Sequence, residues 1–167
     1  MEKLFQTVSC ECGQVTFKAA AKPIVSVVCH CDDCQTAGDV MDSFDGIKPF
    51  RHADGGTPYV ILHDKQWSAV EGQEFLEAVK LKPDSPTTRY VASCCRSPMF
   101  LKFGPGFWTS AFRERFKTPP NLDWHIATDF RASELPYEDS LPRFKRFPLR
   151  LYYARLFRAR LRAAFRA

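Results

Sequence analysis

The sequence predicts a mainly β fold with a basic amphipathic helix added at the C-terminus. Three observations lead to this prediction. Short runs rich in Val, Ile, Phe, Tyr and Thr recur through the first 130 residues, all seven cysteines fall into three tight groups, and the last 25 residues hold nine Lys or Arg and no acid. These patterns indicate, in that order, strands, metal binding by cysteine ligands and a helix with a charged face.

Six short segments carry the strand pattern, and turn-forming residues separate them. The segments are 14–19, 23–30, 57–63, 74–81, 88–95 and 99–103. Asp-Gly-Gly at 54–56 and Lys-Pro-Asp-Ser-Pro at 82–86 are typical of turns. The segment 107–116 is predicted as a short helix that the prolines of 117–122 end. Residues 1–131 are therefore predicted to form one small domain with little helix.

The chain changes character after residue 131. The Pro-rich segment 132–148 is predicted as a linker, and 149–167 as an amphipathic helix. At about 100° per residue, the helix has an apolar side and an opposite basic side. The apolar side holds Tyr153, Leu156, Phe157, Leu161 and Ala164, and the basic side holds Arg155, Arg158, Arg162 and Arg166.

The formal net charge of +5 is unevenly distributed. Residues 143–167 carry nine basic side chains, whereas residues 1–142 carry 15 basic and 19 acidic ones. The C-terminal helix is therefore expected either to dock on the acidic globule or self-associate, or to lie on an anionic membrane surface. A single Arg stripe supplies no base readout, so no specific nucleic acid is expected as a partner.

The length of 167 residues suggests one domain with an appendage. No stretch approaches the roughly 20 apolar residues that a membrane span needs. The first residues lack the basic and then apolar pattern of a signal peptide, so we expect a cytoplasmic protein. In a reducing compartment, seven cysteines favour metal ligands or reactive thiols over disulfides.

The three cysteine groups have the spacing of metal ligands. They are Cys10-Glu11-Cys12-Gly13, Cys29-His30-Cys31-Asp32-Asp33-Cys34 and Cys94-Cys95. Soft thiolates select zinc over magnesium or calcium, and zinc takes them in a tetrahedron. A triplet leaves a fourth position open, as in a catalytic site, whereas two pairs together close a structural one. We therefore expect two Zn²⁺ sites, one structural and one open; the competing interpretation is that the cysteines are buried, inert core residues.

The order of these motifs, followed by Ser97-Pro98, resembles the glutathione-dependent formaldehyde-activating enzyme (GFA) family, which includes the centromere protein V group. The resemblance covers residues 10 to about 103. It implies a compact β-sheet fold with a structural zinc, held by the first cysteine pair and a late Cys-x-x-Cys, and a catalytic zinc held by the central triplet. The implied ligands are Cys29, Cys31 and Cys34 for the catalytic site and Cys10 and Cys12 for the structural one.

The late motif departs from the family pattern. Cys95 aligns with the family's final cysteine, which puts Ala92 where the earlier cysteine belongs. Cys94 then either supplies the fourth sulfur from a displaced position or packs as a neutral thiol. Adjacent side chains point to opposite faces of a strand, but in a turn both could reach one metal, and we predict both as ligands. The adjacent pair also looks like the usual form of a separate branch of the superfamily, in which the family's activity cannot be assumed.

The resemblance implies a carbon–sulfur lyase that joins glutathione to formaldehyde as S-hydroxymethylglutathione, or reverses that reaction. A small thiol or thiol adduct is then the expected partner, because an open zinc position stabilises a thiolate or polarises a carbonyl. Asp32 and Asp33, predicted as a solvated loop tip, would repel the carboxylates of glutathione. The alternative is a non-catalytic, zinc-stabilised binding module whose basic helix contacts a membrane surface, nucleic acid or a protein.

The histidines carry weaker signals. His52, His63 and His125 are isolated in the sequence and are predicted as surface or core residues rather than ligands. His30 lies between two cysteines and is predicted as a packed or solvated residue rather than a proton relay.

Overall fold

The computed structural model describes residues 5–44 and 46–164, with side chains as far as Arg158. Within these residues the strands are β1 (Phe5–Ser9), β2 (Thr16–Ala20), β3 (Val25–Cys29), β4 (Thr57–His63), β5 (Trp67–Glu71), β6 (Leu76–Val79), β7 (Thr87–Ala92), β8 (Ser97–Phe103), β9 (Trp108–Phe112) and β10 (Trp124–Ile126). The α-helices are α1 (Asp32–Asp42) and α2 (Leu149–Ala164), and the short 3₁₀ turns are η1 (Asp64–Gln66), η2 (Gln73–Phe75), η3 (Arg113–Arg115) and η4 (Thr128–Phe130). The predicted mainly β fold with a C-terminal helix is confirmed.

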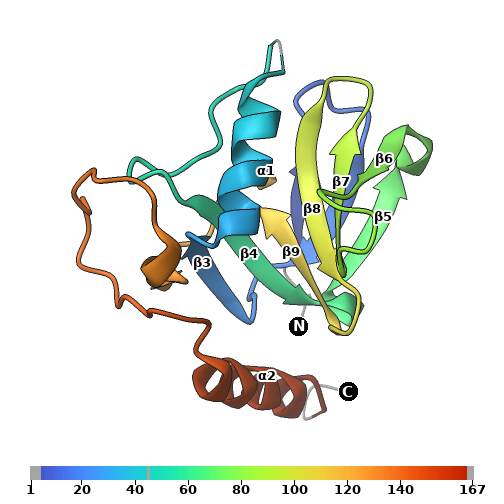
Figure 1. Cartoon of the computed structure of the whole chain (residues 1–167). Helices are drawn as coiled ribbons and strands as arrows, with labels where there is room; N and C mark the ends of the chain where they lie inside the picture. The colour runs from blue at the N-terminus through green and yellow to red at the C-terminus, as the bar shows by residue number, and fades with distance from the viewer. Residues whose placement is uncertain (1–4, 45, 165–167) are drawn as a thin grey trace.

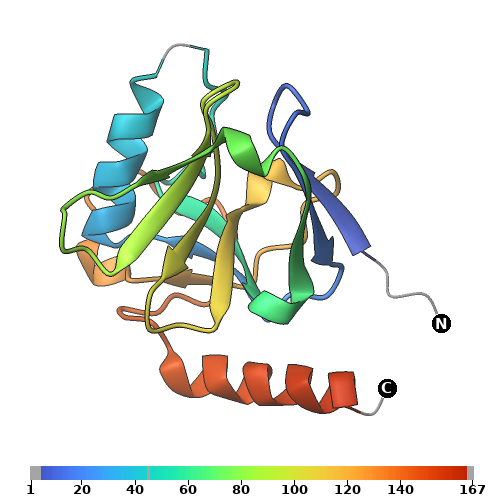
Figure 2. The same cartoon turned by 90° about the vertical axis from the view of Figure 1, so that its right-hand side faces the viewer.

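The strands form two sheets. The larger has the order β10-β3-β4-β9-β8-β7-β6, and the smaller has the order β1-β2-β5. All pairings are antiparallel except that of β10 with β3. Helix α1 lies against one face of the large sheet and the small sheet lies on its other side (Figures 1 and 2). The middle of the large sheet is therefore covered on both faces: β3 is buried throughout and β4 along all but its last residue.

Alternation along β4 divides the interior into two cores. Tyr59 and Ile61 face the core shared with α1, whereas Val60 and Leu62 face the core under the small sheet. This is the period of two expected of a strand that is buried on both faces. The central strand β3 follows the same rule, because Val25, Val27 and Cys29 all belong to the α1 core. The same alternation at the end of β3 places Cys29 on the side of the α1 core and the next residue, His30, on the opposite side of the sheet.

Helix α1 was not predicted, and Asp32 and Asp33 lie in its first turn rather than in a loop tip. Carboxylates are favourable there because they face the positive end of the helix dipole. Tertiary packing compensates for the weak helix propensity of the segment, since Cys34, Ala37 and Met41 are buried at helical spacing. Sequence reasoning missed the helix because its first turn consists of polar and metal-ligand residues.

The helix predicted over 107–116 is wrong. Residues Trp108–Phe112 form the strand β9, which pairs with both β4 and β8, and η3 follows it. Aromatic and hydroxyl residues suit a central strand, and the pairing on both sides outweighs the local pattern.

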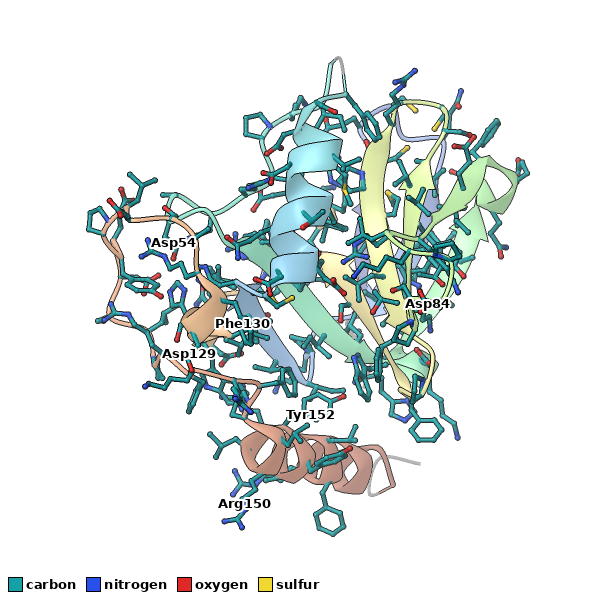
Figure 3. The ribbon with its side chains drawn as sticks, in the orientation of Figure 1. Asp54, Asp84, Asp129, Phe130, Arg150 and Tyr152 are labelled. Atoms are coloured by element: carbon teal, nitrogen blue, oxygen red, sulfur yellow. The ribbon has the colours of Figure 1, made fainter. Side chains whose placement is uncertain are left out.

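Helix α2 packs on the domain through a face that keeps Leu156 of the predicted apolar side but otherwise differs from it. Tyr152 and Leu156 are buried in the α1 core, whereas Tyr153 and Phe157 of the predicted apolar side are exposed. The Tyr152 ring lies 5.3 Å from those of Trp108 and Phe147. Figure 3 shows Tyr152 between the helix and the sheet and Arg150 pointing away from both. Spacing alone did not show which apolar stripe would meet the sheet.

One basic residue of α2 also faces the domain. Arg155 forms an ion pair of 2.9 Å with Asp123 and lies over the Trp124 ring. Of the predicted apolar side, Leu161 and Ala164 have side chains outside the described residues, as does Arg162 of the basic side; Arg166 lies beyond the described chain. None of the helices described is long and apolar enough to cross a membrane. Contact of α2 with a membrane surface or with a second copy stays a prediction.

We expect Tyr152→Ala to lower the free energy of unfolding by about 3 kcal/mol, because it leaves a cavity under α2. Tyr152→Phe is expected to be neutral or slightly stabilising, since the buried hydroxyl finds no hydrogen-bond partner among the described residues. Tyr153→Ala is the matched control and should change stability by less than about 0.5 kcal/mol. Urea denaturation measures all three, and equal effects at 152 and 153 would show that α2 is not docked in solution.

Candidate metal centres

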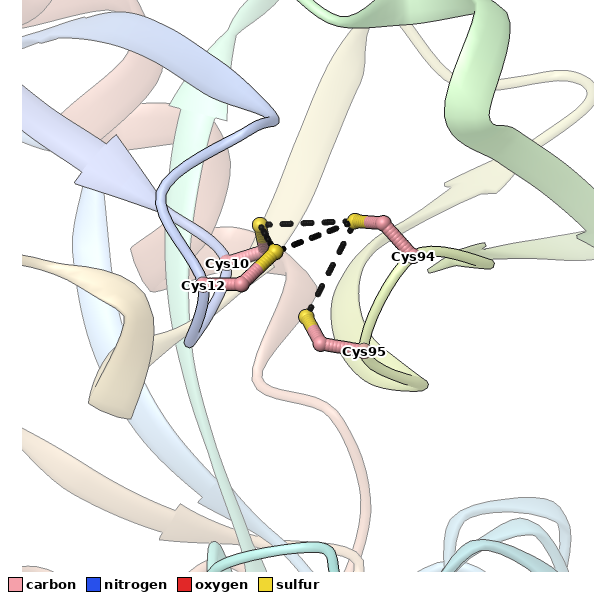
Figure 4. A group of neighbouring side chains, drawn as sticks. All are labelled: Cys10, Cys12, Cys94 and Cys95. Atoms are coloured by element: carbon pink, nitrogen blue, oxygen red, sulfur yellow. Dashed lines mark hydrogen bonds between the residues drawn. The ribbon is translucent and has the colours of Figure 1, made fainter.

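Four cysteines from two distant loops converge on one point, and we name Cys10, Cys12, Cys94 and Cys95 the four-cysteine group (Figure 4). Cys10 and Cys12 come from the loop between β1 and β2, and the other two come from the turn between β7 and β8. The sulfur–sulfur distances are 3.6 Å for Cys10–Cys12, 3.8 Å for Cys10–Cys94, 3.4 Å for Cys12–Cys94 and 3.9 Å for Cys94–Cys95. A tetrahedron with bonds of 2.3 Å to sulfur has edges of about 3.8 Å, so the thiols fit a zinc ion.

Two left-handed backbone positions make this convergence possible. Gly13 has φ of 80° and closes the first loop, where its N–H donates to the carbonyl of Cys10 at 3.1 Å. Arg96 has φ of 57° in the turn that carries the adjacent cysteines. Because Cys94 and Cys95 lie in this turn and not in a strand, both thiols face the same point. The structure thus brings Cys94 to the position of a fourth ligand, as its sulfur is the one nearest to Cys12.

Polar contacts hold the second half of this group in place. Ser97 Oγ lies 3.1 Å from the sulfur of Cys95 and accepts hydrogen bonds from the N–H of Glu11 and from Arg115. Burial alone would raise the pKa of Cys95, but hydrogen bonds from Ser97 and from backbone N–H groups lower it to about 6. Glu11 also pairs with Arg115 and with Lys48, both at 2.6 Å. These contacts link the two loops independently of any metal.

A second group lies where β3 passes into α1, and we name Cys29, Cys31 and Cys34 the cysteine triplet. Cys29 ends the strand, Cys31 is the N-cap of α1, and Cys34 is in its first turn. The Cys29 and Cys31 sulfurs are 3.5 Å apart, and all three sulfurs lie within 4.8 Å of one another. Among the described residues this group has three members, so it matches the open pattern predicted for the triplet.

The triplet holds one thiolate readily. Hydrogen bonds from Cys29 and Cys34, with the helix N-terminus, lower the pKa of Cys31 to about 3. Hydrogen bonding to Cys31 in turn raises the pKa of Cys29 well above its usual value, and burial adds to that effect. A divalent cation must therefore displace protons from the other two thiols, so its affinity rises with pH.

A buried arginine lies beside the triplet. Arg89, on β7, is 1% exposed, and its Nη2 donates to the carbonyl of Asp33 at 3.0 Å. Its Nε and Nη1 have no hydrogen-bond partner among the described residues. Its positive charge contributes to the low pKa of Cys31 and partly opposes the hydrogen bonding to Cys31 and the burial that raise the pKa of Cys34 to about 12. Three thiolates and a divalent cation carry one net negative charge, which this guanidinium would balance.

The triplet has one side open to solvent. Cys31 is half-buried, whereas Cys29 and Cys34 are buried. A surface hollow of about 390 Å³ flanks this end of α1. Its walls include Asp32, Gln35 and Thr36 of the helix and Arg51, Gly55 and Ser133 from the facing loops. The hollow provides room for a small ligand next to the helix turn that carries the triplet.

A third group of metal-ligand side chains was not predicted, and we name His30, Asp54 and His125 the histidine cluster. All three are 1% exposed or less. His30 Nε2 lies 3.1 Å from His125 Nδ1 and 3.7 Å from Asp54 Oδ2, and the last two atoms are 3.2 Å apart. Burial lowers the pKa of His30 to about 4, which keeps its ring neutral.

His125 is a core residue, one of the two placements predicted for the isolated histidines, but its neighbours His30 and Asp54 were not predicted. His125 is fully buried in the cluster, and His52 Nδ1 lies 3.0 Å from Asp54 Oδ1. The sequence contained no local signal, because these residues are far apart along the chain and the β3–β10 pairing unites them. His63 is elsewhere, where its Nδ1 accepts from the N–H of Lys65 and caps η1.

Comparison with known proteins supports part of this description. Residues 5–47 match the model of the family described as glutathione-dependent formaldehyde-activating enzyme, a span that contains Cys10, Cys12 and the triplet but ends before Cys94. A crystal structure of a Rhodobacter sphaeroides protein is similar with a TM-score of 0.50 and 10% sequence identity, covering 82% of this chain and 98% of that one. At this identity the likeness concerns the fold alone. No curated protein gives a significant match.

Proposed function

We propose that the cysteine triplet holds a catalytic zinc ion and that the protein acts as a carbon–sulfur lyase on a thiol–aldehyde adduct such as S-hydroxymethylglutathione, in line with the match of residues 5–47 to the GFA family model. The observation that supports the proposal is the difference between the two cysteine groups. Four thiols complete a tetrahedron, whereas three leave one position for a substrate or water. The partial exposure of Cys31 gives this group contact with solvent, and the hollow lies beside the same helix turn at Asp32 and Gln35.

The reaction needs a stabilised thiolate and a polarised carbonyl. In the cleavage direction the carbon–sulfur bond breaks, the sulfur keeps the electron pair, and the hydroxyl proton leaves as the aldehyde forms. When bound at the triplet, zinc would supply the positive charge that favours the thiolate at neutral pH. The reverse direction forms the same bond by attack of the thiolate on the aldehyde carbon.

The protein's own groups would hold this arrangement in place. Gln35 Nε2 donates to the carbonyls of His30 and Phe130 at 2.7 and 2.6 Å, and its Oε1 accepts from the N–H of Ala132. These bonds tie the first turn of α1 to the segment that walls the hollow. Asp32 and Asp39 make this wall acidic, although Arg51 pairs with Asp39 at 2.6 Å. A neutral or cationic thiol would therefore enter more readily than one with two carboxylates.

The test is Cys31→Ser in the reduced, zinc-loaded protein. We expect the variant to lose one zinc per chain and to form or cleave the adduct no faster than buffer alone, while circular dichroism stays native. Asp33→Asn is the control, because it removes an exposed charge in the same turn without removing a thiol. The rate of adduct formation from glutathione, and from an uncharged thiol such as 2-mercaptoethanol, would be followed by NMR. A wild-type rate equal to the uncatalysed one with both thiols would refute the enzyme proposal.

A further inference from the structure

The end of β3 presents ligand side chains to two opposite faces of the large sheet. Cys29 belongs to the α1 core, and alternation directs His30 to the other face. The register of the parallel pair places His125 beside Val28 and Ile126 beside Cys29. His125 is therefore on the same face as His30, and the loop before β4 brings Asp54 to both. The histidine cluster is thus a separate site that shares only a backbone segment with the triplet.

The three ligand atoms of the cluster have the spacing of a tetrahedral metal site. Their separations are 3.1, 3.2 and 3.7 Å. Zinc bound to nitrogen and oxygen at 2.0–2.2 Å requires edges of about 3.3–3.5 Å. Three atoms at these distances, from three separate segments of the chain, leave one vertex of the tetrahedron for a further ligand.

The carboxylate of Asp54 gives a second, independent indication. Asp54 is 0% exposed, and its Oδ1 accepts from the N–H of Gly56 at 3.0 Å. Its Oδ2 accepts no hydrogen bond among the described residues, although it lies 3.2 Å from His125 Nδ1 and 3.7 Å from His30 Nε2. A buried carboxylate oxygen without a partner is costly, and a cation between it and the rings removes that cost.

The proton positions on His125 strengthen this argument. Its Nε2 lies 2.9 Å from Asp139 Oδ2, so Nε2–H donates to that carboxylate. His125 Nδ1 faces Asp54 Oδ2 at 3.2 Å. Without a proton on Nδ1, two lone pairs meet at this distance, and a cation between them removes the repulsion. A carboxylate behind a histidine is also the usual outer partner of a metal-bound imidazole.

The predicted linker closes the site. The Tyr137 ring packs edge-on against His125 and His30, with centroids at 4.8 and 5.9 Å. The guanidinium groups of Arg131 and Arg143 lie 4.3 and 4.2 Å from the Tyr137 ring centroid. Segment 142–144 pairs with His125 through two backbone hydrogen bonds of 2.9 Å, from the N–H of His125 to Pro142 and from that of Phe144 to His125. This segment therefore acts as a cover for the cluster.

Space around His30 is restricted in a way that fixes its ring. A Cβ at Gly56 would lie 2.6 Å from His30 Cε1 and 2.4 Å from Val28 Cγ1. The backbone of the loop thus packs directly on the imidazole and holds Nε2 toward Asp54. A preset ring orientation is what a metal site requires, because the ligand lone pairs must converge before the ion binds.

From these observations we propose that His30, Asp54 and His125 form a third metal site, a buried His₂Asp site that binds Zn²⁺ and fastens segment 132–148 to the large sheet. The site is distinct from both cysteine groups and does not depend on the lyase proposal. Its metal stabilises the end of β3 and is not the ion that meets the substrate. Asp139 is a positioning residue that acts through His125.

The experiment counts zinc in the full chain. The reduced protein would be saturated with Zn²⁺, freed of loosely bound metal by gel filtration, and assayed by elemental analysis. Asp54→Asn keeps the size of the side chain and the acceptor for Gly56, but puts an amide nitrogen at the ligand position in one of its two rotamers. We expect it to lose one zinc per chain with native circular dichroism. His63→Gln, which removes a histidine elsewhere, should lose none.

X-ray absorption at the zinc edge of the wild-type protein gives a second measurement that needs no variant. We expect the spectrum to show scattering from the outer atoms of imidazole ligands in addition to scattering from sulfur ligands. The imidazole signal should persist in Cys31→Ser, because that variant removes a ligand of the triplet and none of the histidine cluster. Asp139→Asn should keep the scattering but weaken the binding of one zinc by about 10–100-fold. Absence of imidazole scattering in the saturated wild-type protein would overturn the proposal and would leave a metal-free network in which an imidazolium His125 donates to both aspartates.

Discussion

Removing the metal from the four-cysteine group is expected to lower the melting temperature by about 10–20 °C, which corresponds to about 5 kcal/mol in a chain of this size. Structural zinc ions in small peptides contribute about 10–16 kcal/mol of binding free energy. The loss here should be smaller, because Ser97 Oγ still accepts from the N–H of Glu11 and from Arg115, which also pairs with the Glu11 carboxylate. Cys10 and Cys94 would be protonated after removal, since burial raises their pKa values, whereas Cys95, with a pKa of about 6, would stay a thiolate. The destabilisation then comes from the lost cross-link and not from charge repulsion.

The variant that tests this expectation also settles the role of the adjacent cysteines. Cys94→Ser should lose one zinc and show the same fall in melting temperature as the chelated wild type. Gln14→Ala, an exposed change in the same loop, should stay within about 0.5 kcal/mol of the wild type. Scanning calorimetry with metal analysis measures both quantities. If Cys94→Ser kept its zinc and its melting temperature, Cys94 would be a neutral packed thiol and the group would have three ligands.

The same group should release its metal as the pH falls. Protons compete with zinc for the thiolates, and the raised pKa values of Cys10 and Cys94 mean that this competition begins at a higher pH than for exposed thiols. Stability that depends on the metal is therefore present at neutral and alkaline pH and is lost as the pH decreases.

Arg89→Met is expected to weaken zinc binding by the triplet by about 10–100-fold, the range found when groups around a metal site are removed. The buried guanidinium balances the negative charge of three thiolates and a divalent cation. Without the metal, the same charge is buried with two nitrogens unpaired, which is costly. We therefore expect the metal-free variant to be as stable as the metal-free wild type or more so. A variant that binds zinc more weakly but is at least as stable without metal would show that the guanidinium balances charge. A variant that loses both zinc affinity and metal-free stability would show simple damage to the fold.

Competition with a chromophoric chelator measures the affinity, and urea denaturation in chelator measures the metal-free stability. Arg89→Lys is the control, because it retains the charge but not the full set of donors. It should recover most of the zinc affinity. An Arg89→Met protein that binds zinc like the wild type would show that the triplet does not need a buried counter-charge.

The sequence by itself determined the chemistry of the cysteines. Cys-x-Cys and Cys-x-x-Cys spacings act over a few residues, so local chain geometry is enough to predict that Cys10 and Cys12, or Cys29, Cys31 and Cys34, converge. The strand pattern was predictable for the same reason, since alternation is a local property. The adjacent pair was harder, because the outcome depended on whether residues 94 and 95 lie in a strand or in a turn.

Tertiary structure alone decided where helix α1 and strand β9 form, which face of α2 docks, and which residues make the histidine cluster. Helix α1 forms because Ala37 and Met41 are buried against the large sheet, and β9 forms because two neighbouring strands pair with it. The face of α2 that docks is set by the rings that it meets. The histidine cluster unites residues 30, 54 and 125, which only the β3–β10 pairing and the loop before β4 bring together. Contacts between residues so far apart depend on the whole fold, and no spacing in the sequence encodes them.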